Sequence, residues 1–203
     1  MARKLNLEMA ARNDAKTERD PYDFYATDPK TVELLLNQLE KDNIKLCRNS
    51  VWECACGNGH ISEVLKKRGY SVISTDIIQR EYQLDRVIDF LKLKENPYFY
   101  TDTILTNPPY KDATKFVLKA LEIMAQGDLI VFYLKDRFLE GAERYEKIFT
   151  KYPPRYVYCH VDRQNMAMRG EFDKYCQNSN TQFFIWCIWQ KGYKGETTVR
   201  WIK

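Results

Sequence analysis

Short apolar runs alternate along this chain with amphipathic stretches. Strand-like runs cover residues 51–55, 70–75, 103–106 and 128–134, and Ile61, Val64 and Leu65 show helical spacing between the first two runs. Further amphipathic helices are predicted over residues 111–126 and 139–150. Because strands joined by crossover helices pair in parallel, this part of the chain predicts an α/β fold built on a parallel sheet.

The last part of the chain predicts a different kind of pairing. Residues 155–161 and 181–189 are apolar and rich in aromatic side chains, so they are expected to close the sheet as a pair of strands, with antiparallel pairing as one option. A final strand is predicted near residues 197–202. The stretch between the closing strands, residues 162–180, is polar and irregular, and long loops of this kind are usually functional or disordered.

Length and composition predict one domain. A chain of 203 residues with 44% hydrophobic and 14% aromatic residues is enough for one core and short for two. No apolar run approaches the roughly eighteen residues that a membrane span needs, so no membrane partner is expected. Residues 1–20 carry charges of both signs without a hydrophobic signal core, and they are predicted to form a flexible or helical extension outside a domain over residues 21–203.

The cysteines predict reduced thiols in a cytoplasmic protein. Cys54, Cys56 and Cys187 fall in apolar runs, and the chain has no CxxC pair, in which two residues separate the cysteines. A zinc site needs clustered ligands, whereas this chain has only two histidines, His60 and His160, so no metal is predicted. None of the cysteines follows a proline, which disfavours the thiolate chemistry of cytosine C5 methylation.

A glycine-rich turn, CGNGH at residues 56–60, joins the strand-like run at 51–55 to the helical pattern after it. Gly57 and Gly59 allow positive φ and a close approach of the backbone to a ligand, and the helix offers unpaired N–H groups. A dinucleotide fingerprint would have a third glycine where this chain has Ser62, and the Lys-Ser/Thr pair of a phosphate-binding loop is missing. The turn therefore argues against NAD, FAD and a P-loop.

Acidic residues follow the next strand-like runs. Asp76 ends the run at 70–75, where an acid can accept hydrogen bonds from ribose hydroxyls or cap a turn. Asp89, beside Phe90, could accept from an adenine amino group with a ring as a wall, or could serve as a helix N-cap. Glu53, which precedes the glycine turn, could bind a ligand or be a solvated strand end.

The sequence Asn107-Pro108-Pro109-Tyr110 follows the apolar run at 103–106. Two prolines hold φ near −65° and contribute no N–H, so the Asn107 amide and the Pro108 carbonyl project in a set geometry. Both can accept hydrogen bonds from one NH₂ group, which would prepare a poorly nucleophilic amino nitrogen for attack on an electrophilic carbon. The alternative is an ordinary loop with two prolines, with Tyr110 as a packing aromatic.

Taken in this order, the motifs resemble those of S-adenosylmethionine-dependent amino-methyltransferases. Within that group they resemble DNA adenine methyltransferases, especially small phage- or prophage-type enzymes, over residues 22–190. The resemblance implies a Rossmann-like class I methyltransferase fold: a mainly parallel seven-stranded sheet with an antiparallel closing strand and helices on both faces. It also implies S-adenosylmethionine as cofactor, S-adenosylhomocysteine as product and DNA as partner, with residues 21–203 as a catalytic domain that lacks a separate target-recognition domain.

The resemblance carries over to particular residues. Thr27, in the segment FYATDP at residues 24–29, would contact the methionine carboxylate, although the inserted Asp28 departs from the commonest form of that motif. The implied cofactor-binding residues are Tyr25, Thr27, Glu53, Cys56, Gly57, Gly59, Asp76, Ile77, Asp89, Phe90 and Asn107. The implied catalytic residues are Asn107, Pro108, Pro109 and Tyr110, and the candidates for stacking on an extruded base are Tyr110, Phe172 and Tyr175.

The sequence leaves other acceptors open. RNA adenine, the amino group of cytosine and a protein glutamine amide suit the same tetrapeptide, and a catalytically idle cofactor-binding subunit would keep the same fold. Release-factor glutamine methyltransferases usually carry an additional N-terminal helical domain, for which the residues before the glycine turn are few. The net charge of +4 is mild, and the basic residues after the tetrapeptide suit either phosphate contacts or a solvated face: Lys111, Lys115, Lys135, Arg137 and Arg144.

Overall fold

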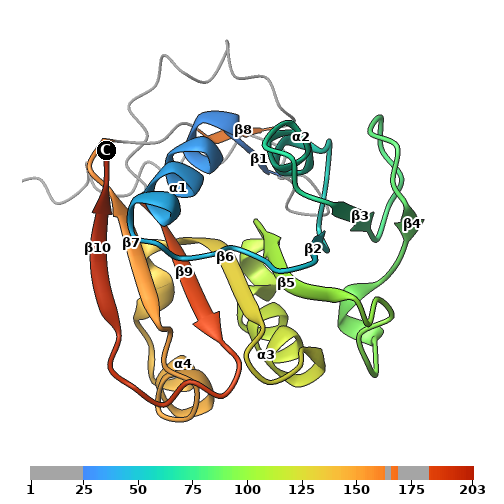
Figure 1. The fold of residues 1–203 in the computed structure, drawn as a ribbon. Helices are drawn as coiled ribbons and strands as arrows, with labels where there is room; N and C mark the ends of the chain where they lie inside the picture. Colours follow the sequence, from blue (N-terminus) through green and yellow to red (C-terminus); the bar gives the residue numbers. More distant parts are fainter. Residues whose placement is uncertain (1–24, 163–165, 169–182) are drawn as a thin grey trace, which may run out of the picture.

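The computed structural model describes residues 25–162, 166–168 and 183–203 (Figure 1). The extension predicted over residues 1–20 lies outside the described residues. The helices and strands are β1 Tyr25–Thr27, α1 Pro29–Lys41, β2 Ser50–Glu53, α2 His60–Lys67, β3 Val72–Asp76, β4 Arg86–Val87, β5 Thr101–Thr106, α3 Ala113–Ile123, β6 Leu129–Lys135, α4 Ala142–Arg144, β7 Tyr156–His160, β8 Met166–Met168, β9 Phe184–Gln190 and β10 Thr198–Ile202.

The main sheet confirms the predicted α/β architecture. Its strand order is β10-β7-β9-β6-β5-β2-β3-β4, in which β9 runs antiparallel to both neighbours and every other pairing is parallel. The sheet has eight strands, one more than the predicted seven: β10 is the strand predicted near residues 197–202, and the two-residue strand β4 adds to the edge of β3. After β3 and β4 the chain returns to place β5 on the other side of β2, so the strand order reverses between β2 and β5.

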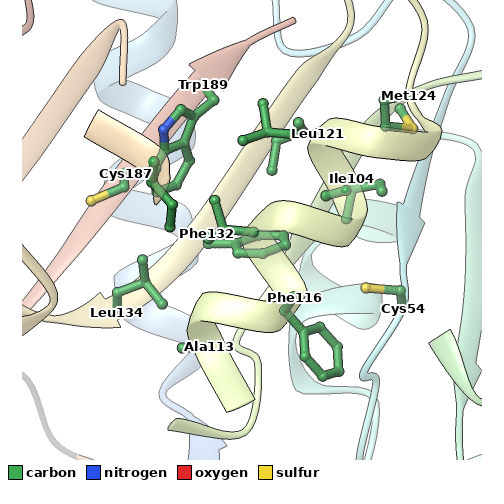
Figure 2. Close-up of a cluster of buried hydrophobic side chains, with 14 of the residues drawn as sticks. Cys54, Ile104, Ala113, Phe116, Leu121, Met124, Phe132, Leu134, Cys187 and Trp189 are labelled. Carbon is green, nitrogen blue, oxygen red and sulfur yellow. The ribbon is translucent and has the colours of Figure 1, made fainter. Parts of the chain in front are cut away.

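Two apolar layers sandwich the sheet, as the alternation along the strands requires. On β6, Ile130 and Phe132 face the layer that contains α3, whereas Val131 and Tyr133 face the layer that contains α1 and α2. Figure 2 shows the first layer, in which Phe116, Leu121 and Met124 lie near side chains of the sheet such as Ile104 and Trp189. The prediction of helices on both faces is confirmed.

Helix α1 was not predicted, although its signals are present in the sequence. Asp28 is its N-cap and accepts a hydrogen bond from the Lys30 N–H at 2.9 Å, and Pro29 occupies the first turn, where its missing N–H costs nothing. Val32, Leu35, Leu36 and Leu39 are buried at helical spacing. Asp28, which departs from the commonest form of the upstream motif, thus has a clear structural role.

Two predicted elements need correction. The strand-like run that Asp89 was expected to follow is only Arg86–Val87, because the chain turns at Asp89 into a 3₁₀ helix. The helix expected over residues 139–150 is instead the short α4 followed by a π-helical turn, Tyr145–Phe149. Residues 162–180, predicted to be irregular, contain the short strand β8, which pairs antiparallel with β1.

Candidate active site

A pocket opens where the strand order reverses, at the carboxyl ends of β2, β3 and β5. It encloses about 1020 Å³ of non-atom space, its open mouth included. Most of the predicted site residues line it: Thr27, Glu53, Cys56, Asp76, Ile77, Asp89, Phe90, Asn107, Pro108, Pro109 and Tyr110. In open α/β sheets this crevice is where ligands bind, so the topology alone makes this pocket the candidate active site.

The glycine turn after β2 lies at the point where the strand order reverses. Gly57 has φ of 58° and Gly59 has φ of 79°, a region that residues with a Cβ rarely adopt. The Gly57 N–H donates to Asp76 Oδ2 at 2.8 Å, and the Cys56 N–H donates to the Thr75 carbonyl at 3.0 Å. These bonds tie the turn to the end of β3, and Gly59 then begins α2 as its N-cap.

Asp76 is buried and already has a structural task. Besides the Gly57 N–H, it accepts a bond from the Ile78 N–H through Oδ1 at 3.2 Å. A carboxylate has about four acceptor sites, so two backbone bonds leave capacity for a ligand hydroxyl. Ile77, next in the chain, is 49% exposed and adds an apolar surface to the pocket.

Glu53 ends β2 and is almost completely buried, which excludes the alternative of a solvated strand end. Ser62 Oγ donates to Glu53 Oε2 and also lies 2.6 Å from Ser74 Oγ. Burial raises the pKa of Glu53 to about 8, against hydrogen bonds from Ser62 and Cys56 that lower it, and the nearby Asp76 raises it further. The pocket therefore contains a carboxyl group that titrates close to neutral pH.

This titration predicts a pH-dependent stability. Because the pKa of Glu53 in the folded chain lies above its ordinary value of 4.5, its contribution is fully favourable below pH 4.5 and is lost as the pH rises through about 8. One such group can change the free energy of unfolding by at most about 1.4 kcal/mol per pH unit. We expect thermal melts to show Tm falling between about pH 5 and pH 8 and levelling above, and Glu53→Gln to flatten this fall. The exposed control Glu140→Gln should keep the slope of the native sequence; an equal slope in Glu53→Gln would contradict the assignment.

The structure shows the N-cap alternative for Asp89 and gives Phe90 a packing role. Asp89 is the N-cap of the 3₁₀ helix Phe90–Lys92: its Oδ1 accepts from the Leu91 N–H at 3.2 Å, and its Oδ2 lies 3.0 Å from Lys92 Nζ. Phe90 is buried in the core and stacks on Phe116, with ring centroids 5.0 Å apart. Both residues still line the pocket, so capping and packing hold them at its wall.

The tetrapeptide Asn107 to Tyr110 begins directly after β5. Asn107 Nδ2 donates to Thr27 Oγ1 at 3.0 Å, which joins the turn to β1. The Pro109 carbonyl accepts from the Asp112 N–H at 3.0 Å as the chain enters a 3₁₀ turn, Tyr110–Asp112, that leads into α3. A stiff turn is thus anchored at both ends, and its first residue is held by a hydroxyl from a distant part of the sequence.

Tyr110 is half-buried and belongs to a chain of aromatic contacts. Its ring centroid lies 5.8 Å from that of Phe184, which in turn stacks on Tyr133 at 5.3 Å. Lys135 Nζ lies 4.6 Å from the Tyr110 centroid, within the range of a cation–π contact. Tyr110 is therefore a packing aromatic, as the alternative interpretation predicts, and it also lines the pocket.

The other predicted residues are placed as follows. Gly57 and Gly59 form the turn but are not among the lining residues, and Tyr25 lies in β1 opposite Met168. Phe172 and Tyr175 lie outside the described residues. Among the basic candidates, Lys115 pairs with Asp112 at 2.7 Å. Arg144 donates to the Phe138 and Arg137 carbonyls, so local contacts account for it.

Sequence reasoning missed several lining residues, including His60, Arg80 and Phe116, and it predicted Lys111 only as a candidate for phosphate contacts. His60 follows the glycine turn directly, and burial lowers its pKa. Lys111 follows the tetrapeptide, so proximity to a recognised motif could have identified both residues. Phe116 reaches the pocket from the first turns of α3, and only the packing of that helix reveals it.

Five cysteines lie in the described part of the chain. Cys47, Cys54, Cys56, Cys159 and Cys187 are free thiols, and burial raises the pKa of each. Within residues 25–162, 166–168 and 183–203, no group of three metal-ligating side chains is found. In the same ranges, no helix has the length and apolar character to cross a bilayer.

The sequence matches no protein-family model and no curated protein. Solved structures with a similar fold do exist. A candidate class I S-adenosylmethionine-dependent methyltransferase from Listeria monocytogenes matches with a TM-score of 0.55 and 13% identity, over 85% of this chain and 62% of that chain. A candidate RNA methyltransferase from Pyrococcus horikoshii matches with a TM-score of 0.57 and 16% identity, over 87% of this chain and 91% of that chain.

A candidate hemolysin from Lactococcus lactis is also similar, with a TM-score of 0.59 and 10% identity, over 84% of this chain and 92% of that chain. At such identities the likeness concerns the fold alone, because one fold hosts many functions. The chain therefore has the Rossmann-like fold of class I methyltransferases, and its function must be argued from the pocket.

Proposed function

We propose that this chain transfers the methyl group of S-adenosylmethionine to the exocyclic amino nitrogen of adenine in DNA. One observation carries the proposal: Asn107 and Pro108 line the same pocket as Glu53 and Asp76, at the reversal of strand order between β2 and β5. The groups suited to hold an amino acceptor thus share a pocket with acids suited to hold a cofactor. Both sets are anchored by hydrogen bonds to the backbone or to buried hydroxyls.

The residues present fit S-adenosylmethionine, which supplies an activated methyl group bound to a sulfonium sulfur. Asp76, with acceptor capacity beyond its two backbone bonds, would bind the ribose hydroxyls. Ile77 and Phe90 would cover the adenine ring, and Glu53 would lie near the amino-acid part of the cofactor. The glycine turn allows the backbone to come close to the ligand, because neither glycine presents a Cβ.

On the acceptor side, Asn107 Oδ1 and the Pro108 carbonyl would accept hydrogen bonds from the two amino hydrogens. This arrangement increases electron density on the nitrogen, which attacks the methyl carbon while the carbon–sulfur bond breaks and a proton leaves the nitrogen for solvent. No covalent intermediate with the chain is required. Tyr110 would contact the ring of the acceptor base.

DNA adenine is proposed over other acceptors because of the family resemblance of the tetrapeptide and glycine turn. The similar structure from Pyrococcus horikoshii is described as a candidate RNA methyltransferase, so RNA adenine is the alternative to be tested beside DNA. A paired adenine must leave the base stack before its amino group can reach any such pocket. Single-stranded and duplex substrates therefore have to be compared.

The test is transfer of labelled methyl groups. The chain is incubated with methyl-labelled S-adenosylmethionine and, separately, with duplex DNA, single-stranded DNA, RNA and cell-extract protein, and the labelled nucleoside or residue is identified after digestion. We expect label in N6-methyladenine from DNA. Label only in RNA or only in glutamine would replace the acceptor, and binding of the cofactor without transfer to any acceptor would favour the idle subunit.

A further inference from the structure

The hydroxyl of Thr27 makes the contact in the pocket that bears most directly on the acceptor group. It accepts a hydrogen bond from Asn107 Nδ2 at 3.0 Å, across 80 residues of sequence. Thr27 is only 3% exposed, and Ala26 before it is 2% exposed. The bond is therefore made by a hydroxyl that has little access to water.

The surroundings of Thr27 restrict its position from both sides. On one side, β1 pairs antiparallel with β8, with Thr27 opposite Met166. On the other side, Asp28 caps α1, and the Thr31 N–H donates to the Asp28 carbonyl at 2.9 Å. A residue held between a strand pairing and a capped helix can hold a partner side chain in a fixed rotamer.

An amide side chain presents a donor on one atom and an acceptor on the other, and rotation about its last bond exchanges them. A donor facing an NH₂ group would repel it, whereas an acceptor would bind it. The orientation of the Asn107 amide therefore decides whether the pocket can hold an amino group. With Nδ2 bonded to Thr27, the acceptor atom Oδ1 is turned away from the threonine.

We propose that Thr27 is a positioning residue, whose hydroxyl holds the Asn107 side chain in the place from which Oδ1, turned away from Thr27, can accept a hydrogen bond from the amino group of the acceptor. This inference rests on the proposed function. It differs from the role that the family resemblance implies for Thr27, a contact with the methionine carboxylate of the cofactor. The two roles predict opposite effects on cofactor affinity and on turnover.

Thr27→Val tests the inference, because valine keeps the shape of threonine and removes the hydroxyl. We expect kcat at saturating cofactor to fall about 10- to 100-fold, in the range that misplacement of a reacting group produces. The dissociation constant for S-adenosylmethionine, measured by equilibrium titration without acceptor, should change less than about twofold. Loss of a charge-assisted hydrogen bond from Thr27 to the methionine carboxylate would raise it by more than that. Thr27→Ser, which restores the hydroxyl, should recover most of the turnover.

Thr103→Val is the matched control. Thr103 is also buried and donates its hydroxyl, to the Leu46 carbonyl at 2.6 Å, but it lies in β5 outside the lining of the pocket. This variant should lower Tm and leave kcat unchanged. A similar loss of kcat in Thr103→Val would show that the effect of Thr27→Val is general destabilisation.

Two outcomes would overturn the role of Thr27 alone: unchanged kcat with weakened cofactor binding in Thr27→Val, or equal impairment of the valine and serine variants. A native chain that methylates no acceptor would overturn the proposed function together with this role.

The hydrogen bond itself has a separate readout, the side-chain amide resonances of Asn107, assigned by their loss in Asn107→Ala. Thr27→Val should shift them and Thr103→Val should not; unshifted resonances would refute the contact.

Discussion

Replacing Asn107 with alanine should lower methyl transfer by about 10²- to 10³-fold or more, the usual effect of removing one group that stabilises developing charge. The variant loses the amide that we propose as the acceptor of one amino hydrogen, whereas the Pro108 carbonyl can still accept the other. Cofactor affinity should stay near that of the native chain, because Glu53 and Asp76 are unchanged. Single-turnover rates and an equilibrium titration with S-adenosylmethionine measure the two quantities separately.

The loss of the Asn107 bond to Thr27 should also lower stability by about 1 kcal/mol, so Tm must be measured beside the rates. Asn49→Ala serves as the control, since Asn49 is exposed at the opposite end of the sheet, before β2. Its rate should equal the native rate. Undiminished methyl transfer by Asn107→Ala would rule out the proposed catalytic role of the tetrapeptide.

The second large effect is expected at Gly59, where alanine should weaken both folding and cofactor binding. A Cβ at this position would overlap the ring of Tyr82, and the backbone has φ of 79°. The positive φ alone costs about 1–2 kcal/mol for alanine, and overpacking typically adds about 1–3 kcal/mol. Urea unfolding measures the total, and titration with S-adenosylmethionine shows the distortion of the turn.

The chain offers a matched control for this substitution. Gly69 has φ of 84°, but a Cβ there would meet nothing within 4 Å, so Gly69→Ala carries the backbone cost without the clash. The Tyr82 hydroxyl donates to Glu63 Oε1 at 2.8 Å, so moving the ring aside would break this hydrogen bond. In a Tyr82→Ala background, Gly59→Ala should cost no more than Gly69→Ala. Equal costs of the two single variants would refute the clash.

Several features could be predicted from sequence because they depend on neighbours along the chain. The apolar run of β6 is buried on both faces, so its hydrophobicity is continuous and easily recognised. Gly57 and Gly59 predict a tight turn from the sequence alone, and their positive φ values confirm that this turn needs glycine. The order of glycine turn, acid and proline turn likewise predicts half of the residues that line the pocket.

Other features depend on residues that are distant in sequence. The place of β9 between β6 and β7 is decided by which apolar surfaces cover each other, and the apolar runs alone do not encode that order. Asp89 could be read as a ligand or as an N-cap, and the backbone after it shows the capping bond. Phe116 reaches the pocket only through the packing of α3, and Arg80 through the course of the loop between β3 and β4.

The sequence by itself determined the α/β class of this protein, the glycine turn and the stiff turn at Asn107, because local backbone sterics and hydrophobic periodicity act over a few residues. Only the tertiary structure decided which groups meet: Thr27 with Asn107, Gly57 with Asp76, and Glu53 with Ser62. The physical reason is that a hydrogen bond between distant residues forms only after the sheet and its helices have packed. Burial then gives such a bond its strength and raises the pKa of Glu53 towards neutrality.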